Sequence, residues 1–85
     1  MTVRVLLFGH YRDAAPPEAE GGAFALPLPD GATVADAARA LAERDGRFAD
    51  LLARTRVAVR AEFAAPDTRL AEGDELAFLP PMSGG

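Results

Sequence analysis

Residues 30–46 of the chain read DGATVADAARALAERDG, and this stretch has the features of a single helix. Thr33 is suited to cap its N-terminus, and Asp36, three residues later, is placed near the positive end of the helix dipole. Apolar residues recur at the spacing of one helix face: Val34, Ala37, Ala38 and Leu41. Gly46 is expected to end the helix in a left-handed conformation. Because the apolar face is rich in alanine, we expect this helix to pack closely against a sheet.

Two predicted strands come before the helix. Residues 2–8, TVRVLLF, alternate, so that Val3, Val5 and Leu7 face one way and Arg4, Leu6 and Phe8 face the other. Residues 23–29, AFALPLP, alternate again, and Pro27 predicts an edge strand because proline has no N–H for a ladder. Residues 9–22 are rich in Gly, Pro and charge and are expected to form a long turn. The simplest connection is a hairpin.

The pattern after the helix predicts a second pair of elements. Residues 47–54 are expected to form a short helix, with Phe48, Leu51 and Leu52 on one face. One strand is predicted over 56–64 and the last over 75–80, where two prolines end it. The acidic stretch from Glu72 to Glu75 between them is interpreted as a solvated turn with a tight glycine.

This order of elements predicts an α+β domain. Two strands, a helix and two strands can place the helix on one sheet face, with the first and last strands parallel at the centre. This is the order of a ubiquitin-like β-grasp, a mixed sheet of four to five strands packed on one main helix. We expect residues 1–79 to form that domain and residues 80–85 to form an extended C-terminal tail.

The composition excludes several classes of site and partner. The 85 residues include no cysteine, so disulfides, thiolate metal sites and a cysteine nucleophile are absent, and all nine basic residues are arginine. The net charge of −4 argues against nucleic-acid binding, which needs a basic surface. No apolar run approaches the roughly 18 residues of a membrane span, and the first residues lack the layout of a signal peptide. We therefore expect a cytoplasmic protein without nucleic-acid or membrane partners.

The last residues, FLPPMSGG, have the composition of a projecting tail. Pro80 and Pro81 keep the chain extended as it leaves the sheet, and Met82 and Ser83 continue it. Gly84 and Gly85 have no side chain, so they can enter a channel that any Cβ would block. Six residues span at most about 20 Å, which is enough to reach a buried active site in a partner.

A C-terminal carboxylate at Gly85 has two chemical fates of interest. Joined to AMP it becomes an activated acyl group, and a sulfur donor can then convert it into a thiocarboxylate with a nucleophilic sulfur. Alternatively, a lysine of another protein can attack it, which gives an isopeptide bond. The residues alone leave both fates open.

Three segments together resemble the MoaD/ThiS family of ubiquitin-like sulfur carriers. They are VRVLLFGHYRD near the start, TVADAARAL in the helix and LAEGDELAFLPPMSGG at the end, so the resemblance covers nearly the whole chain. The turn with Gly-Asp-Glu, the strand, Pro-Pro, two residues and Gly-Gly are similar to the ending of MoaD-type chains, the small subunits of molybdopterin synthase. One departure is Arg60, since the family often has asparagine there.

The resemblance implies a mechanism in which this chain carries sulfur and a partner performs the catalysis. A MoeB-like enzyme would adenylate Gly85 with ATP, and a sulfurtransferase would supply the sulfur of the thiocarboxylate. The tail, with Gly84 and Gly85 as its reacting end, would enter a MoaE-like large subunit in a heterotetramer and donate sulfur to cyclic pyranopterin monophosphate. The chain itself would bind no cofactor and no metal and would supply no acid–base residue.

The resemblance also implies the docking residues. They are the hydrophobic residues Phe8, Phe63 and Leu79, followed by the tail residues Pro80, Pro81, Met82 and Ser83. Other hypotheses are a sulfur carrier for thiamine, cysteine or tRNA thiolation, a ubiquitin-like protein modifier, and a binding module whose tail is inert.

Overall fold

The computed structural model of this chain describes residues 1–81. Its strands are β1 (Thr2–Leu7), β2 (Ala23–Pro27), β3 (Arg56–Val59), β4 (Glu62–Ala64) and β5 (Glu75–Leu79). They form one sheet in the order β2-β1-β5-β3-β4. The pair β1 and β5 is parallel, and the other three pairs are antiparallel. The predicted mixed β-grasp sheet is confirmed, with β5 at its centre and β2 at an edge.

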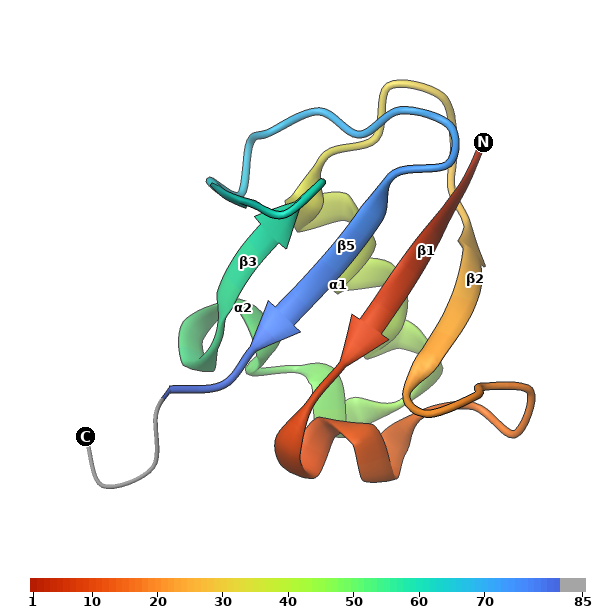
Figure 1. The fold of residues 1–85 in the computed structure, drawn as a ribbon, viewed down its shortest axis with the longest axis vertical. Coiled ribbons are helices and arrows are strands. Elements are labelled where there is room, and N and C mark those ends of the chain that lie inside the picture. Colours follow the sequence, from red (N-terminus) through yellow and green to blue (C-terminus); the bar gives the residue numbers. More distant parts are fainter. Residues whose placement is uncertain (82–85) are drawn as a thin grey trace.

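The main helix, α1 (Val34–Arg44), crosses one face of the sheet (Figure 1). Its N-terminus has a full capping box, because the Thr33 side chain accepts from the Asp36 N–H while the Asp36 side chain accepts from the Thr33 N–H. The prediction for Gly46 was wrong: Asp45 ends the helix in an extended conformation with φ −153°. Gly46 instead begins a short 3₁₀ helix, η2 (Gly46–Phe48), because the Asp45 side chain accepts from the Arg47 N–H.

The short second helix is α2 (Leu51–Arg54), so residues 47–54 are divided between two short helices. Phe48 and Leu51 are buried as expected, and Leu52 is half-buried. None of the helices within residues 1–81 combines the length and the apolar character that crossing a membrane requires.

The stretch after β1 differs from the predicted long turn. Residues Gly9–Ala14 form a 3₁₀ helix, η1, in which Tyr11 and Ala14 are buried. The Tyr11 hydroxyl donates to Asp50 Oδ1 at 2.8 Å, and its ring stacks on Phe48. The prediction relied on the Gly, Pro and charge content of the segment, and it overlooked that Tyr11 is an aromatic residue able to join the core.

The predicted strand over 56–64 is in fact a hairpin of β3 and β4. Arg60 and Ala61 have φ of +51° and +68°, so the chain reverses in two left-handed residues. Such turns suit the twist of two antiparallel strands and favour Asn-Gly, which is why Arg-Ala gave no turn signal.

The two faces of the sheet differ completely in environment. Inward side chains pack under α1 into one core, with Val5, Leu76 and Phe78 at 0% exposure. The opposite face, which points toward the viewer in Figure 1, is covered by no other element of residues 1–81. We refer to these as the inner face and the outer face.

Candidate functional site

A continuous apolar row crosses the outer face. The strand registers align Leu6 with Ala23 on one side and Ala77 on the other. Ala77 in turn aligns with Ala58, and Ala58 with Phe63. Since every strand contributes one member, the row spans the whole sheet.

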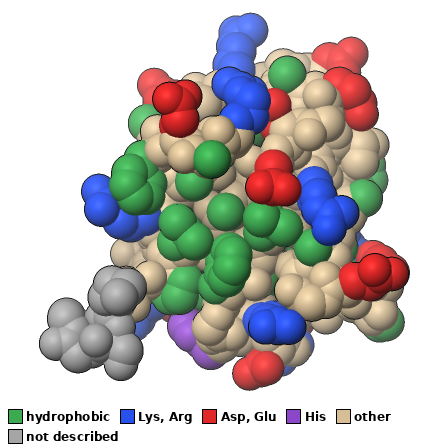
Figure 2. Space-filling model, in the orientation of Figure 1, with side chains coloured by type: hydrophobic (Ala, Val, Ile, Leu, Met, Phe, Trp, Pro, Cys, Tyr) green, Lys and Arg blue, Asp and Glu red, His purple; other side chains and the backbone are tan. Residues whose placement is uncertain are grey.

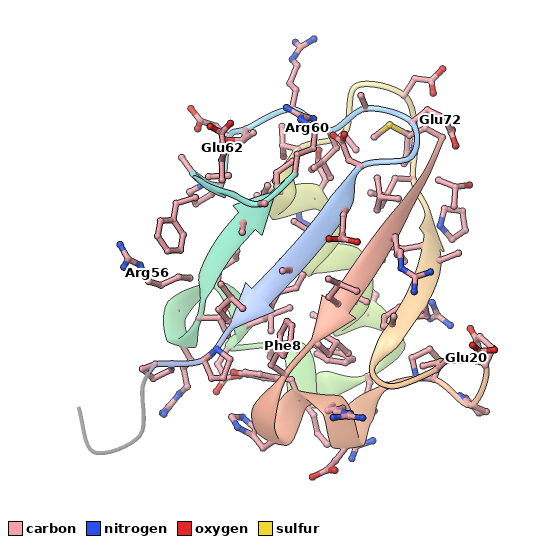
Figure 3. The ribbon with its side chains drawn as sticks, in the orientation of Figure 1. Phe8, Glu20, Arg56, Arg60, Glu62 and Glu72 are labelled. Atoms are coloured by element: carbon pink, nitrogen blue, oxygen red, sulfur yellow. The ribbon has the colours of Figure 1, made fainter. Side chains whose placement is uncertain are left out.

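Two larger side chains, Phe8 and Leu79, extend this row toward the end of β5. Phe8 and Phe63 are exposed by 41% and 66%, and they are the large hydrophobic side chains most open to solvent among residues 1–81. Leu79 is half-buried on the same face. We define the outer patch by the following residues: Leu6, Phe8, Phe63, Ala77 and Leu79. Figure 2 shows hydrophobic side chains gathered on the middle of this face, and Figure 3 shows Phe8 at the end of β1.

Charged residues border the patch at the opposite end of the strands. Arg4 aligns with Glu75, and the Arg60 N–H donates to the Glu75 carbonyl at 3.0 Å. Figure 3 shows Arg60 and Glu62 together at this end of the molecule. Because exposed apolar surface rimmed by charge is typical of a protein-binding surface, the outer patch is a candidate docking site.

The tail leaves the sheet beside this patch. β5 ends at Leu79, and its two neighbours in the sheet are β1 and β3. Pro80 lies against Gly9, where a Cβ would come 3.2 Å from the Pro80 Cγ and where φ is +59°. Gly9 therefore gives Pro80 room at the point where the chain leaves the body.

Of the predicted site residues, Phe8, Phe63, Leu79, Pro80 and Pro81 fall within the described chain. The sheet places Phe63 near Leu79 through Arg56, which aligns with Leu79 and stacks its guanidinium carbon 4.4 Å from the centre of the Phe63 ring. Phe8 continues β1 in an extended conformation next to the end of β5. Their docking role stays a prediction. The remaining predicted residues lie outside the described residues: Met82, Ser83, Gly84 and Gly85.

One site feature, the ion pair between Arg60 and Asp74, was not predicted. The interpretation of Glu72 to Glu75 as a solvated turn was wrong for Asp74, which is 6% exposed. Its Oδ2 accepts from Arg60 Nη1 at 2.6 Å and from the Ala71 N–H at 2.7 Å. Burial raises the pKa of Asp74. The hydrogen bonds from Arg60 and from the Ala71 N–H lower this pKa by a larger amount, so the pKa of Asp74 lies below its ordinary value.

This ion pair has a structural consequence for the outer patch. Arg60 is in the β3–β4 turn, and β4 carries Phe63. Asp74 precedes β5, and its carbonyl accepts from the Arg4 N–H at 2.8 Å. The pair therefore ties the Phe63 hairpin to the turn that leads into β5. The sequence contains only a weak signal for this ion pair, namely an arginine at a turn and several acidic residues that could be its partner.

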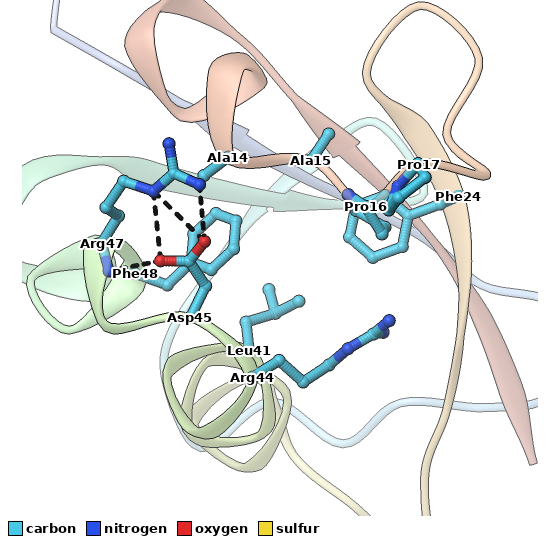
Figure 4. Close-up of a pocket in the computed structure, with 10 residues that line it drawn as sticks. All are labelled: Ala14, Ala15, Pro16, Pro17, Phe24, Leu41, Arg44, Asp45, Arg47 and Phe48. Atoms are coloured by element: carbon cyan, nitrogen blue, oxygen red, sulfur yellow. Dashed lines mark hydrogen bonds and ion pairs between the residues drawn. The ribbon is translucent and has the colours of Figure 1, made fainter.

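A hollow of about 310 Å³ lies between η1 and α1, on residues that include Pro16, Phe24 and Leu41 (Figure 4). Its charges are paired internally. Arg47 binds both carboxylate oxygens of Asp45, at 2.7 and 3.1 Å, and lowers the pKa of Asp45 by this hydrogen bonding. Arg44 is also paired, 3.5 Å from Glu18. The hollow therefore presents few unpaired groups for chemistry.

No metal centre is found in residues 1–81, where no three His, Asp or Glu side chains lie close enough to hold an ion.

Comparison with known proteins gives the family. The model of the ThiS family matches residues 5–85. The chain belongs to the ThiS family. Members of the ThiS/MoaD family are ubiquitin-like sulfur carriers, and the β-grasp sheet described above is their fold. A search of curated proteins gave no match.

Solved structures similar to this ThiS-family chain include molybdopterin converting factor subunits and a small archaeal modifier protein. The putative molybdopterin converting factor, subunit 1, from Pyrococcus furiosus is 26% identical with a TM-score of 0.79, over 95% of this chain and 98% of that chain. A complex of subunits 1 and 2 of molybdopterin-converting factor from Helicobacter pylori contains a chain 26% identical with a TM-score of 0.63, over 100% of both chains. SAMP1 from Haloferax volcanii is 27% identical with a TM-score of 0.77, over 100% of both chains.

Proposed function

We propose that this chain is the sulfur-carrier subunit of a molybdopterin synthase, and that Gly85 carries the sulfur as a thiocarboxylate. The observation that carries the proposal is the outer patch, which lies beside the point where a Gly-Gly tail leaves the central strand. A docked partner would thus cover the patch and receive the tail at the same time.

Two similar structures support this pathway. The Pyrococcus furiosus protein is titled a molybdopterin converting factor, subunit 1, and the Helicobacter pylori structure is a complex of subunits 1 and 2. By analogy, we propose a large subunit as the partner of the outer patch, in a MoaE-like heterotetramer. The exposed Phe63 and Phe8 would be buried in that interface, as aromatic anchors commonly are.

The proposed chemistry takes place at the tail and uses groups of the partners. A MoeB-like enzyme joins the Gly85 carboxylate to the α-phosphate of ATP, and pyrophosphate leaves. Sulfide delivered by a sulfurtransferase then displaces AMP, which leaves the thiocarboxylate. In the large subunit, this sulfur is transferred to cyclic pyranopterin monophosphate, and at each transfer a water molecule supplies the oxygen that regenerates the Gly85 carboxylate.

The described residues would serve this chemistry by positioning. The two neighbours of β5 hold the base of the tail in the middle of the sheet, and Gly9 leaves space for Pro80. The ion pair of Arg60 with Asp74 holds the hairpin that presents Phe63. No acid–base step is assigned to a side chain of this protein.

The experiment that tests the proposal is an intact mass measurement on the full chain with a free C-terminus. The chain is incubated with ATP, the adenylating enzyme and a sulfur source, and the expected result is the mass gain for replacing one oxygen by sulfur. A chain lacking Gly85 is the matched control and is expected to stay unmodified. Addition of the large subunit and cyclic pyranopterin monophosphate should then remove the sulfur again. A complete chain whose mass never changes under these conditions contradicts the proposal.

A second candidate function is a protein modifier, because SAMP1, a small archaeal modifier protein, matches the chain over its full length. In that case the activated Gly85 would form an isopeptide bond with a lysine of another protein. Covalent adducts of the tagged chain with larger proteins, resistant to thiols and absent when Gly85 is deleted, would favour this function over the first.

A further inference from the structure

A groove at the base of the tail is lined by basic side chains. Six described residues line it: His10, Ala53, Arg54, Thr55, Arg56 and Pro81. Two of the six are arginines, a third is histidine and none is acidic, although the whole chain has 13 acidic residues, nine arginines and a net charge of −4. The groove is therefore a local exception to the charge of the protein. We refer to His10, Arg54 and Arg56 as the basic rim.

The rim is placed by three separate elements that are tied together. Arg54 ends α2, and its Nε lies 3.0 Å from Asp50 Oδ2. Asp50 also accepts from the Tyr11 hydroxyl at 2.8 Å, and the His10 ring is next to the Tyr11 ring at 4.1 Å between centroids. Asp50 thus links η1 to α2 across the base of the tail. It is also the carboxylate that partly neutralises Arg54, whose side chain is still 70% exposed.

Arg56 connects the rim to the outer patch. It begins β3, and its guanidinium carbon lies 4.4 Å from the centre of the Phe63 ring. Within residues 1–81, no carboxylate forms an ion pair with it. Figure 3 shows Arg56 at the side of the outer face, extending away from the sheet. A cation stacked on an exposed ring is available to a carboxylate of a docked protein.

We propose that the basic rim binds aspartate and glutamate side chains that surround the tail entrance of the adenylating enzyme. This inference rests on the proposed function, in which that enzyme must receive the tail. The rim adjoins both the outer patch and Pro81, so a partner that covers the patch and takes the tail lies over the rim as well.

Charge explains why such a contact is needed. The tail, residues 80–85, has no cationic side chain, and its reacting end is a carboxylate that must approach the phosphates of ATP. A carrier with net charge −4 gains no general attraction for such a site. Positive charge at the base of the tail gives the approaching molecule a preferred orientation and raises the rate of productive encounters.

The test is the adenylation rate of the full chain with a free C-terminus, measured by ATP–pyrophosphate exchange at increasing carrier concentration. Arg54→Glu and Arg56→Glu each change the charge of the rim. Arg69→Glu is the matched control, because it gives the same change in net charge at another exposed site. The backbone of Arg69 forms a β-bridge with Thr33, near the start of α1. Arg56→Lys keeps the charge and changes the shape.

We expect each rim reversal to raise the KM for the carrier about 10-fold with kcat unchanged, and the difference to shrink as salt screens the charges. Arg56→Lys should stay within about 3-fold of wild type, because a point charge is retained. Thermal unfolding checks that every variant is folded.

The outcomes separate the two proposals. A wild-type chain that is never adenylated overturns the proposed function and this inference with it. A wild-type chain that is adenylated, with rim variants and Arg69→Glu having equal KM at low salt, overturns the inference alone. An equal rise in KM for all three reversals also overturns it, since net charge would then be responsible.

Discussion

The inner and outer faces of β5 have the same hydrophobic character and opposite surroundings. On the inner face, Leu76 and Phe78 are completely buried under α1. On the outer face, Ala77 and Leu79 remain half-buried, and nothing in residues 1–81 packs over them. After Glu75, the remaining residues of this strand, LAFL, are apolar on both faces, although only one face belongs to the core.

The comparison shows where hydrophobic residues need an explanation other than stability. A buried Phe78 removes apolar surface from water in the folded monomer, which stabilises it. An exposed Phe63 gains little of that free energy in the monomer, and gains it only when another surface covers the ring. The outer patch is therefore understood best as surface kept for a partner, and the predictions below test this difference.

The largest expected effect is on stability. Phe78→Ala should lower the free energy of unfolding by about 3–5 kcal/mol, because it leaves a cavity among fully buried neighbours. Phe63→Ala, the matched change on the outer face, should lower it by less than about 1 kcal/mol. Urea denaturation of both variants measures the difference. Equal losses would show that the two faces are not distinct and that Phe63 has a structural role.

The next effect is on binding, where the residue of the outer face, Phe63, is expected to matter. Phe63→Ala should weaken association with the large subunit by about 2 kcal/mol, roughly 30-fold, because an aromatic anchor at an interface is lost. Isothermal titration calorimetry with the purified large subunit measures it. Ala25→Ser, an exposed change on β2 beyond the patch, is the control and should leave the affinity unchanged. Unaltered binding by the Phe63 variant would separate the patch from the proposed interface.

A smaller effect is expected at the base of the tail. Gly9→Ala should cost about 1–2 kcal/mol for a left-handed alanine, and its Cβ should also press on Pro80. Gly31→Ala is a matched control, because Gly31 has φ +84° and no atom within 4 Å of the added Cβ. Both variants should lose similar stability, but only Gly9→Ala should slow adenylation. If the two variants are adenylated equally fast, the Pro80 contact does not position the tail.

The smallest effect concerns the link between the charged border and the Phe63 hairpin. Because the pKa of Asp74 is lowered in the folded chain, its ionised form stabilises the fold above the ordinary carboxyl pKa of about 3.9. That contribution is lost as the pH falls through the lower pKa of the folded state. Asp74→Asn should cost about 1 kcal/mol at neutral pH through the lost charged hydrogen bond.

The measurement is urea denaturation between pH 2 and pH 7. The wild-type chain should lose more stability on acidification than the Asp74→Asn chain does, so that the two curves converge at the acid end. Curves that stay parallel over the whole range would show that Asp74 has the same pKa in the folded and unfolded chains.

Most of the fold could be predicted from local patterns. Alternation placed Val3, Val5 and Leu7 inward, and the 3.6-residue period with Thr33 and Asp36 placed the helix and its cap. These signals are local, because each depends on neighbours within a few residues along the chain. The η1 helix and the β3–β4 turn were missed, since each is stabilised by contacts that propensity does not describe.

The candidate site was predictable only in part. Strand alternation predicted that Phe8 lies on the same face as Arg4 and Leu6, and family resemblance predicted Phe8, Phe63 and Leu79 as docking residues. Neither source could predict that Arg60 forms an ion pair with Asp74, because many acidic residues could have been the partner of Arg60. The sequence also did not predict that Tyr11 is buried and donates a hydrogen bond to Asp50, since the two residues lie far apart in sequence.

By itself, the sequence determined most of the segments that become strands and helix and the side of each that faces the core. Only the tertiary structure decided what lies around the tail. Parallel pairing of β1 with β5 brings Phe8 and Gly9 to its base, and the hydrogen bond from Tyr11 to Asp50 ties η1 to the start of α2, so that His10 and Arg54 lie beside Arg56. Such neighbours come from distant segments, and their proximity depends on the cooperative packing of the whole core rather than on any local pattern.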